Sequence, residues 1–177
     1  MYNRISIVGG SGSGKTTLCN ILSKELNLPA IHLDGINFKP NWVERDKAER
    51  DTIIANKVFD DKWIIDGNYT KTIKERLDRA DLIIWLDYST FALVKGVFKR
   101  MLKNFKSERT EISGCKERFN FKFMKYVIFY NKCSRSKLTN NLDTIPKEKI
   151  LRFKKQKDLN KWLKDFTHNE NILDAIK

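Results

Sequence analysis

The sequence predicts an α/β fold in which a five-stranded parallel sheet is covered by helices on both faces. Short apolar segments of strand length alternate along the chain with segments of helical periodicity, an order typical of parallel sheets. A glycine-rich loop joins the first predicted strand to the first predicted helix. The 177 residues suit one domain with a single core, taken here as residues 1–177.

The first half of the chain contains four of the predicted strands. The segment from Arg4 to Val8 is rich in β-branched residues and ends in glycines, which favours a buried parallel strand. The other three strands are expected at residues 30–33, 63–65 and 81–87. Apolar residues at helical spacing predict helices at residues 15–27, 44–59 and 71–79.

The second half is dominated by long helical segments around a basic, polar stretch. Helices are expected at about residues 90–104, 119–135 and 158–166. Residues 105–118 are polar and basic, with Gly114 as a breaker. The fifth strand is expected from Lys149 to Phe153, after a turn at Pro146.

Charge is unevenly distributed. The net charge of +13 comes entirely from residues 95–177, which hold 22 Lys and Arg against 9 Asp and Glu. A basic half of this kind favours nucleic acid, an acidic membrane surface or a phosphorylated substrate, and composition does not choose among them. The apolar runs are too short to span a bilayer, and the start of the chain lacks a secretory leader, so a cytoplasmic protein is expected.

The cysteines indicate no disulfide framework. Cys19, Cys115 and Cys133 are widely spaced and include no Cys-x-x-Cys pair, so three reduced thiols are expected. His32 lies in an apolar strand, and we expect a hydrogen-bonded structural residue or a partner of a site residue, not a metal ligand.

The glycine-rich loop matches the phosphate-binding pattern G-x-x-x-x-G-K-[ST] at every fixed position. Glycines let the backbone turn so that its N–H groups face phosphate oxygens, and the following helix adds the positive end of its dipole. Lys15 is expected to reach the β- and γ-phosphates, and the Thr16 hydroxyl to bind Mg²⁺. The predicted ATP-binding residues are Gly9, Gly10, Ser11, Gly12, Ser13, Gly14, Lys15, Thr16 and Thr17.

Three predicted strands end in an aspartate: Asp34, Asp66 and Asp87. The carboxyl ends of parallel strands border the crevice in which ligands bind, so these carboxylates are expected near the transferred phosphate. One would hold Mg²⁺ or its waters and another would accept the proton of an attacking hydroxyl. Residues 131–134 read Asn-Lys-Cys-Ser and lack the final aspartate of a guanine-recognition motif, which disfavours a regulatory GTPase.

At these residues the sequence resembles the adenylate-kinase-like P-loop kinases, and among them the DNA topology modulation proteins. The matching stretches are residues 7–17, 28–34, 63–69, 76–77, 80–81, 86–87 and 115–119. The resemblance implies a P-loop kinase core with a helical acceptor insert at residues 35–60 and a lid at about residues 105–120. It places Asp66 beside Mg²⁺. Where nucleoside monophosphate kinases carry Gly-Phe-Pro-Arg, this chain has Gly-Asn-Tyr-Thr, which disfavours such an acceptor.

The resemblance also directs attention to the residues that would hold substrate. Lid arginines are expected to close on ATP, and the favoured candidates are Arg118 and Arg109, because a planar guanidinium suits phosphate charge. Catalytic roles are assigned to Lys15, Asp34 and Asp66, with the choice of base between the two aspartates left open. The acceptor candidates are Asp34, Trp42, Arg45, Gly67, Asn68, Tyr69 and Arg76, with Arg50 also in the insert.

The function expected from the sequence is therefore transfer of the γ-phosphate of Mg·ATP to a small-molecule acceptor. The alternative is a nucleic-acid-associated ATP-binding protein that modulates DNA topology through its basic half. Aromatic residues in that half favour the alternative as stacking platforms, but Phe119, Phe123, Tyr126 and Tyr130 fall on one helix face, which favours core packing.

Overall fold

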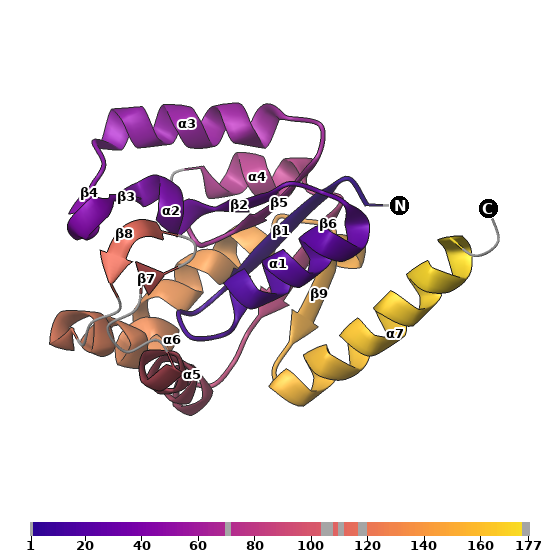
Figure 1. Ribbon diagram of the computed structural model, residues 1–177. Coiled ribbons are helices and arrows are strands. Elements are labelled where there is room, and N and C mark those ends of the chain that lie inside the picture. The colour runs from indigo at the N-terminus through magenta and orange to yellow at the C-terminus, as the bar shows by residue number, and fades with distance from the viewer. Residues whose placement is uncertain (1, 70–71, 104–107, 110–111, 117–119, 175–177) are drawn as a thin grey trace.

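The computed structural model describes residues 2–69, 72–103, 108–109, 112–116 and 120–174. A five-stranded parallel sheet runs through the centre, with strand order β2-β5-β1-β6-β9 (Figure 1). Its strands are β1 (Arg4–Gly9), β2 (Ala30–His32), β5 (Trp63–Asp66), β6 (Leu82–Leu86) and β9 (Ile150–Phe153). The predicted sheet and its helical cover are confirmed.

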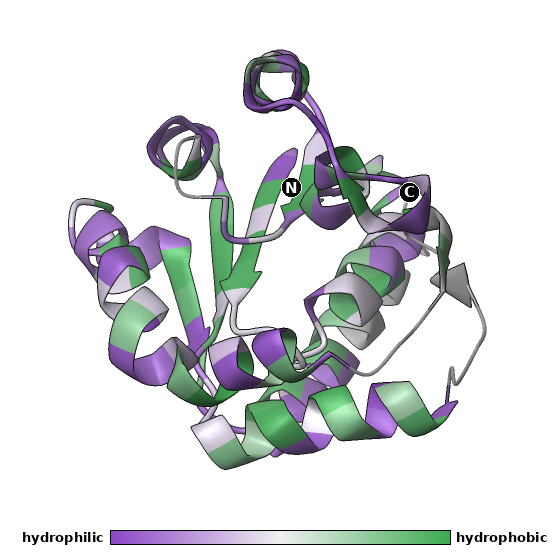
Figure 2. Ribbon diagram, turned by 90° about the vertical axis from the view of Figure 1, so that its left-hand side faces the viewer, coloured by the Kyte–Doolittle hydropathy of each residue, from purple (hydrophilic) through white to green (hydrophobic). Residues whose placement is uncertain are grey.

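Helices pack on both faces of the sheet because successive side chains of each strand point to opposite faces. On one face Ile5, Ile7 and Ile84 pack against α1 (Lys15–Leu26), α5 (Thr90–Lys103) and part of α6 (Phe121–Leu142). On the other, Val8 and Ile65 pack against α3 (Lys47–Phe59) and α4 (Ile73–Arg79). Figure 2 shows hydrophobic residues concentrated in the central strands. Each fully buried aliphatic side chain contributes about 1.5–3 kcal/mol.

The chain closes with the short 3-10 helix η2 (Lys147–Lys149), strand β9 and helix α7 (Gln156–Asp174). The helix expected at residues 119–135 continues to Leu142, and the one expected at residues 158–166 is longer at both ends. In these segments periodicity located the helix but not its ends, because polar residues continue the helices beyond the apolar face.

The acceptor insert predicted at residues 35–60 contains more than a helix. Its elements are α2 (Leu33–Asn37), β3 (Phe38–Lys39), the 3-10 helix η1 (Pro40–Trp42), β4 (Val43–Glu44) and α3, with β3 and β4 antiparallel. The prediction that Asp34 ends a strand is wrong: β2 stops at His32, and Asp34 lies in the first turn of α2. An acidic side chain is stabilised there by the helix dipole, so Asp-Gly does not form the expected turn.

The segment predicted as a lid contains a second small hairpin. Strands β7 (Glu108–Arg109) and β8 (Ile112–Lys116) pair antiparallel. Strand β8 lies against η1 and β3 of the insert. The thiol of Cys115 links the two, since it accepts a hydrogen bond from the Trp42 backbone at 3.2 Å and donates one to the Lys39 carbonyl at 3.4 Å. The basic stretch thus contains strands that its polar composition did not predict.

Candidate functional site

The glycine-rich loop lies at the carboxyl end of β1, the central strand of the sheet, and leads into α1. Gly12 and Gly14 adopt positive φ angles of 86° and 88°, a conformation open to glycine but strained for other residues. The Lys15 ammonium donates a hydrogen bond to the Gly10 carbonyl at 3.0 Å and so folds over the loop. Ser13 is buried, and its hydroxyl has no hydrogen-bond partner within the described part of the chain.

Close packing, and not only backbone freedom, requires glycine in this loop. A Cβ on Gly12 would lie 2.3 Å from the Leu93 carbonyl oxygen, and a Cβ on Gly10 would lie 2.4 Å from a Leu93 methyl. The contact is reciprocal, because a Cβ on Gly96 of α5 would lie 2.0 Å from the Gly12 carbonyl oxygen. Helix α5 therefore packs directly against the phosphate loop. Gly96 was not among the residues predicted from the sequence, although an isolated glycine within a helical pattern is a signal of such packing.

Asn68 connects the loop to β5. Its side-chain oxygen accepts a hydrogen bond from the Gly9 N–H at 3.0 Å, and its NH₂ donates to the Gly9 carbonyl at 2.7 Å and to the Tyr130 hydroxyl at 3.2 Å. The amide therefore holds both backbone groups of the first glycine. Burial raises the pKa of Tyr130, so this hydroxyl stays protonated at neutral pH.

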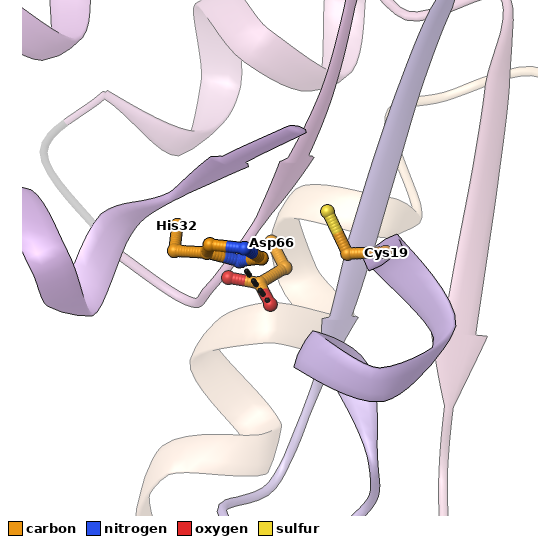
Figure 3. Close-up of side chains that lie close together, drawn as sticks. All are labelled: Cys19, His32 and Asp66. Carbon is orange, nitrogen blue, oxygen red and sulfur yellow. Dashed lines mark hydrogen bonds and ion pairs between the residues drawn. The ribbon is translucent and has the colours of Figure 1, made fainter. Parts of the chain in front are cut away.

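Asp66 ends β5 at the same edge of the sheet as the loop. It pairs in register with Ile7 of β1, two residues before Gly9, and is 4% exposed. One carboxylate oxygen lies 3.2 Å from His32 Nδ1, and the Cys19 thiol of α1 lies nearby (Figure 3). Burial, together with the Asp66 charge, raises the pKa of Cys19, whose thiol donates a hydrogen bond to the Ile64 carbonyl at 3.5 Å.

Arg76 brings a buried positive charge to Asp66. The side chain is fully buried and donates one hydrogen bond, from Nη2 to the Gly67 carbonyl at 2.6 Å. Burial lowers the pKa of Arg76 to about 10, and the neighbouring Asp66 carboxylate opposes that shift. Its Nε and Nη1 have no hydrogen-bond partner among the described residues. Gly67 has a φ of 126°, and a Cβ there would lie 2.9 Å from Leu33 Cβ.

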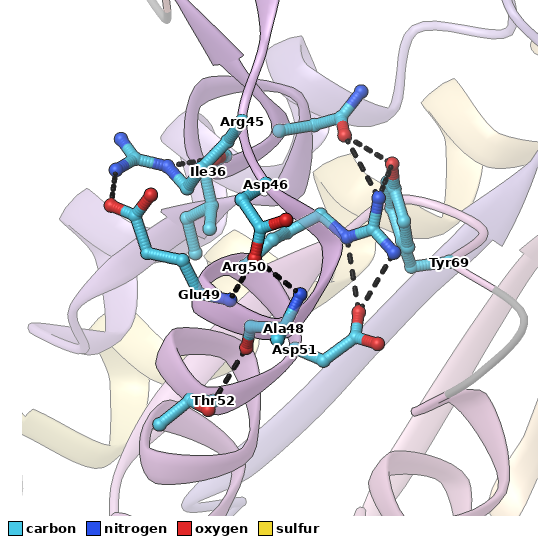
Figure 4. Close-up of polar contacts among 10 residues, drawn as sticks. Ile36, Arg45, Asp46, Ala48, Glu49, Arg50, Asp51, Thr52 and Tyr69 are labelled. Atoms are coloured by element: carbon cyan, nitrogen blue, oxygen red, sulfur yellow. Dashed lines mark hydrogen bonds and ion pairs between the residues drawn. The ribbon is translucent and has the colours of Figure 1, made fainter.

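A second polar cluster lies where the insert meets the chain after β5 (Figure 4). Arg50 is 8% exposed and donates hydrogen bonds to the Tyr69 hydroxyl at 3.0 Å and to Asp51 at 2.8 Å. Its guanidinium also covers the Tyr69 ring, 4.2 Å from the centroid. Asn37 joins the cluster through its side-chain oxygen, which accepts from Tyr69. No sequence signal pointed to Asn37, because only the fold brings α2 beside Tyr69.

The other predicted residues of the insert support its shape. Arg45 donates a hydrogen bond to the Ile36 carbonyl at 2.8 Å and pairs with Glu49. Asn41 and Trp42 have φ angles of 63° and 62°, so the tip of the insert is a strained turn. Asp34 is exposed on α2. Arg109 lies in β7, whereas Arg118 lies outside the described residues.

Nearly the whole chain matches a known protein family. The family model described as "ABC transporter" matches residues 2–171, nearly the whole chain. The chain belongs to this family of P-loop proteins. Across the residues that the structure describes, none of the helices has the length and apolar character needed to cross a membrane. The narrower resemblance to the DNA topology modulation proteins stays a prediction.

Solved structures that are similar to this chain include two kinases. Shikimate kinase from Bacteroides thetaiotaomicron is 18% identical, with a TM-score of 0.49 over 78% of this chain and 83% of that one. A gluconokinase from Sinorhizobium meliloti 1021 is 13% identical, with a TM-score of 0.48 over 97% of this chain and 93% of that one. No curated protein matches the sequence.

Proposed function

We propose that this protein is a kinase that transfers the γ-phosphate of ATP, with Mg²⁺, to a small-molecule acceptor. One observation carries the proposal: the phosphate loop after β1 and the buried Asp66 of the adjacent β5 lie at one edge of the sheet. The segment after β2, which pairs with β5, forms the insert beside that edge. The phosphate loop, the Asp66 carboxylate and the insert are thus neighbours at the carboxyl ends of the strands, where parallel sheets bind ligands.

The residues present fit Mg·ATP. The buried Ser13 hydroxyl without a described partner, the left-handed glycines and the Lys15 ammonium are groups that a polyphosphate would satisfy. Thr16 and Asp66 are the residues that would hold Mg²⁺, and the remaining loop residues, Ser11 and Thr17 included, would border the phosphates. Bound Mg·ATP supplies the phosphoryl group and neutralises part of its charge.

The chain's own part in the reaction is positioning and electrostatics. Lys15 would exchange its contact with the Gly10 carbonyl for a phosphate oxygen, and loop N–H groups would donate to the same anion. Asp34 or Asp66 would orient the acceptor hydroxyl and take its proton. The Arg50–Tyr69 cluster would border the acceptor, and Arg109 and Arg118 would act from the lid. A cytoplasmic location remains the expectation from sequence.

The test is release of ADP from Mg·ATP across a panel of nucleosides, nucleotides and hydroxylated metabolites. One acceptor is expected to raise turnover far above the basal rate. Lys15→Ala should lose that turnover by at least about 100-fold, because it removes a charge from the transferred phosphate. Lys24→Ala, an exposed change on the same helix, is the matched control and should retain it.

Two results would overturn the proposal. Wild-type turnover in Lys15→Ala would show that the loop does not act on phosphate. ATP binding without stimulation by any acceptor, together with DNA binding that weakens steeply with salt, would favour the nucleic-acid-associated protein instead.

A further inference from the structure

Three side chains with metal-binding atoms lie close together near the phosphate loop. Cys19 comes from α1, His32 from β2 and Asp66 from β5 (Figure 3). The thiol sulfur, a ring nitrogen and a carboxylate oxygen all lie within 4.8 Å of one another. Cys19 is fully buried and Asp66 is 4% exposed, so both groups are shielded from water. The proposed phosphoryl transfer gives no role to Cys19 or His32.

The contacts of His32 allow a metal ion to bind between it and Asp66. Its Nε2 lies 3.1 Å from the side-chain oxygen of Asn20, and a hydrogen on Nε2 would satisfy that contact. Its Nδ1 lies 3.2 Å from Asp66 Oδ2, which as a carboxylate also only accepts. With the hydrogen on Nε2, Nδ1 would present its lone pair toward that oxygen. In this tautomer a metal ion bound by both Nδ1 and the carboxylate would satisfy the contact.

We propose that Cys19, His32 and Asp66 form a binding site for a thiophilic divalent metal ion of the Zn²⁺ class. Sulfur, nitrogen and oxygen ligands in this combination suit such an ion, and Mg²⁺ prefers six oxygens. Tetrahedral Zn²⁺ places its nitrogen and oxygen ligands about 3.3 Å apart and its sulfur about 3.5 Å from either. The His32–Asp66 separation already matches, and Cys19 Sγ needs to approach by about 1.3 Å at most.

Asn20 supplies the support that a metal-binding histidine requires. Histidine ligands usually donate their other ring N–H to an oxygen, which fixes the tautomer and aims the free nitrogen at the metal. The Nε2 contact to Asn20 has this form. The Cys19 thiol would lose its proton on binding, so the thiolate and the Asp66 carboxylate together would neutralise the divalent ion. The bound site would then carry no net charge beside the buried Arg76.

The site shares Asp66 with the proposed kinase activity but does not depend on it. Its test is direct metal binding without nucleotide, so failure of one proposal leaves the other standing. Tag-free protein is titrated with Co²⁺, a spectroscopic substitute for Zn²⁺, and thiolate-to-cobalt charge-transfer absorption is recorded. One Co²⁺ per chain is expected, with displacement by Zn²⁺.

Variants assign the signal to its ligands. Cys19→Ala should abolish the charge-transfer band, and the exposed Cys133→Ala is the matched control that should keep it. Asn20→Ala should weaken binding about 10- to 100-fold, and His32→Gln at least as much. Cys19→Val, which fills the buried position, repeats the test if Cys19→Ala does not fold. No stoichiometric binding by wild type, or a band that survives in Cys19→Val, would overturn the proposal and leave the contact between His32 and Asp66 as a hydrogen bond within the protein.

Discussion

The ends of β5 and β6, the two strands that flank β1, carry the same residue type in opposite surroundings. Asp66, the last residue of β5, faces His32 and the buried Arg76, and its neighbour Cys19 is a protonated thiol. Asp87 after β6 is held by two guanidinium groups, with Arg135 at 2.6 Å and Arg152 at 2.5 Å. The β5 end therefore keeps groups that a ligand can engage, whereas the β6 end is already neutralised.

The Asp87 cluster ties elements together. Arg135 comes from α6 and Arg152 from β9, so the carboxylate joins both to β6. The same two arginines lie over the Trp85 ring, 5.4 and 4.3 Å from its centroid. Burial alone would raise the pKa of Asp87, but hydrogen bonds from Arg135 and Arg152 outweigh it and lower that pKa. Under the proposed function Asp66 would serve the chemistry, whereas Asp87 ties β6 to α6 and β9.

The largest expected effect is the difference in turnover between an amide substitution at Asp66 and the same substitution at Asp87. Asp66→Asn should reduce acceptor-dependent turnover by about 100-fold or more, because it removes the proposed metal-binding charge. Asp87→Asn, the same change at the other strand end, should leave turnover close to wild type. Steady-state ADP release with the acceptor that the panel identifies measures both. Equal losses in the two variants would contradict the division of roles.

The next effect concerns how α5, the helix that follows β6, supports the phosphate loop. Gly96→Ala puts a methyl group 2.0 Å from the Gly12 carbonyl oxygen, so α5 or the loop must move. We expect ATP to bind at least about 10-fold more weakly, and the free energy of unfolding to fall by about 1–3 kcal/mol. Lys95→Ala, exposed on the same helix, is the control. Calorimetric titration with Mg·ATP measures the binding. Unchanged affinity would show that packing against α5 does not determine the conformation in which the loop binds ATP.

A smaller effect is expected on the stability that Asp87 provides. Its side chain is 7% exposed, but Arg135 and Arg152 are 32% and 40% exposed, so water partly screens the pairs. Asp87→Asn should therefore lower the free energy of unfolding by about 1–2 kcal/mol. Urea denaturation measures the difference. A variant as stable as wild type would mean that the cluster adds no net stability.

The smallest effect is the pH dependence of that same difference. Because the pKa of Asp87 is lower in the folded chain, its contribution is complete above the pKa of the unfolded state, about 3.9. The contribution is lost as the pH falls through the folded pKa. The stability gap between wild type and Asp87→Asn should be constant near neutral pH and should shrink below about pH 4. Urea midpoints between pH 7 and pH 3 follow it, and a gap that widens in acid would reverse the assignment.

Sequence reasoning succeeded where one short segment carries the whole signal. The loop from Gly9 to Thr16, the alternation of strands with helices and the buried strand before Asp66 depend on local spacing and hydrophobicity. It failed where neighbours along the chain were misleading. The Asp-Gly pair at Asp34 is part of a helix, and the basic stretch around Gly114 contains a hairpin that packs against Pro40.

What the sequence by itself determined is the kind of chemistry: a phosphate-binding loop on a parallel sheet, with acidic residues at the strand ends. Only the tertiary structure decided which acidic residue remains available. Asp66 and Asp87 each end a predicted strand, and in the sequence only the family resemblance singled out Asp66. In the structure Arg135 and Arg152 reach Asp87 from 48 and 65 residues away. Cys19 of α1 and His32 of β2 lie beside Asp66 only in the folded chain. The surroundings of a charge depend on long-range packing, which strand and helix patterns do not encode.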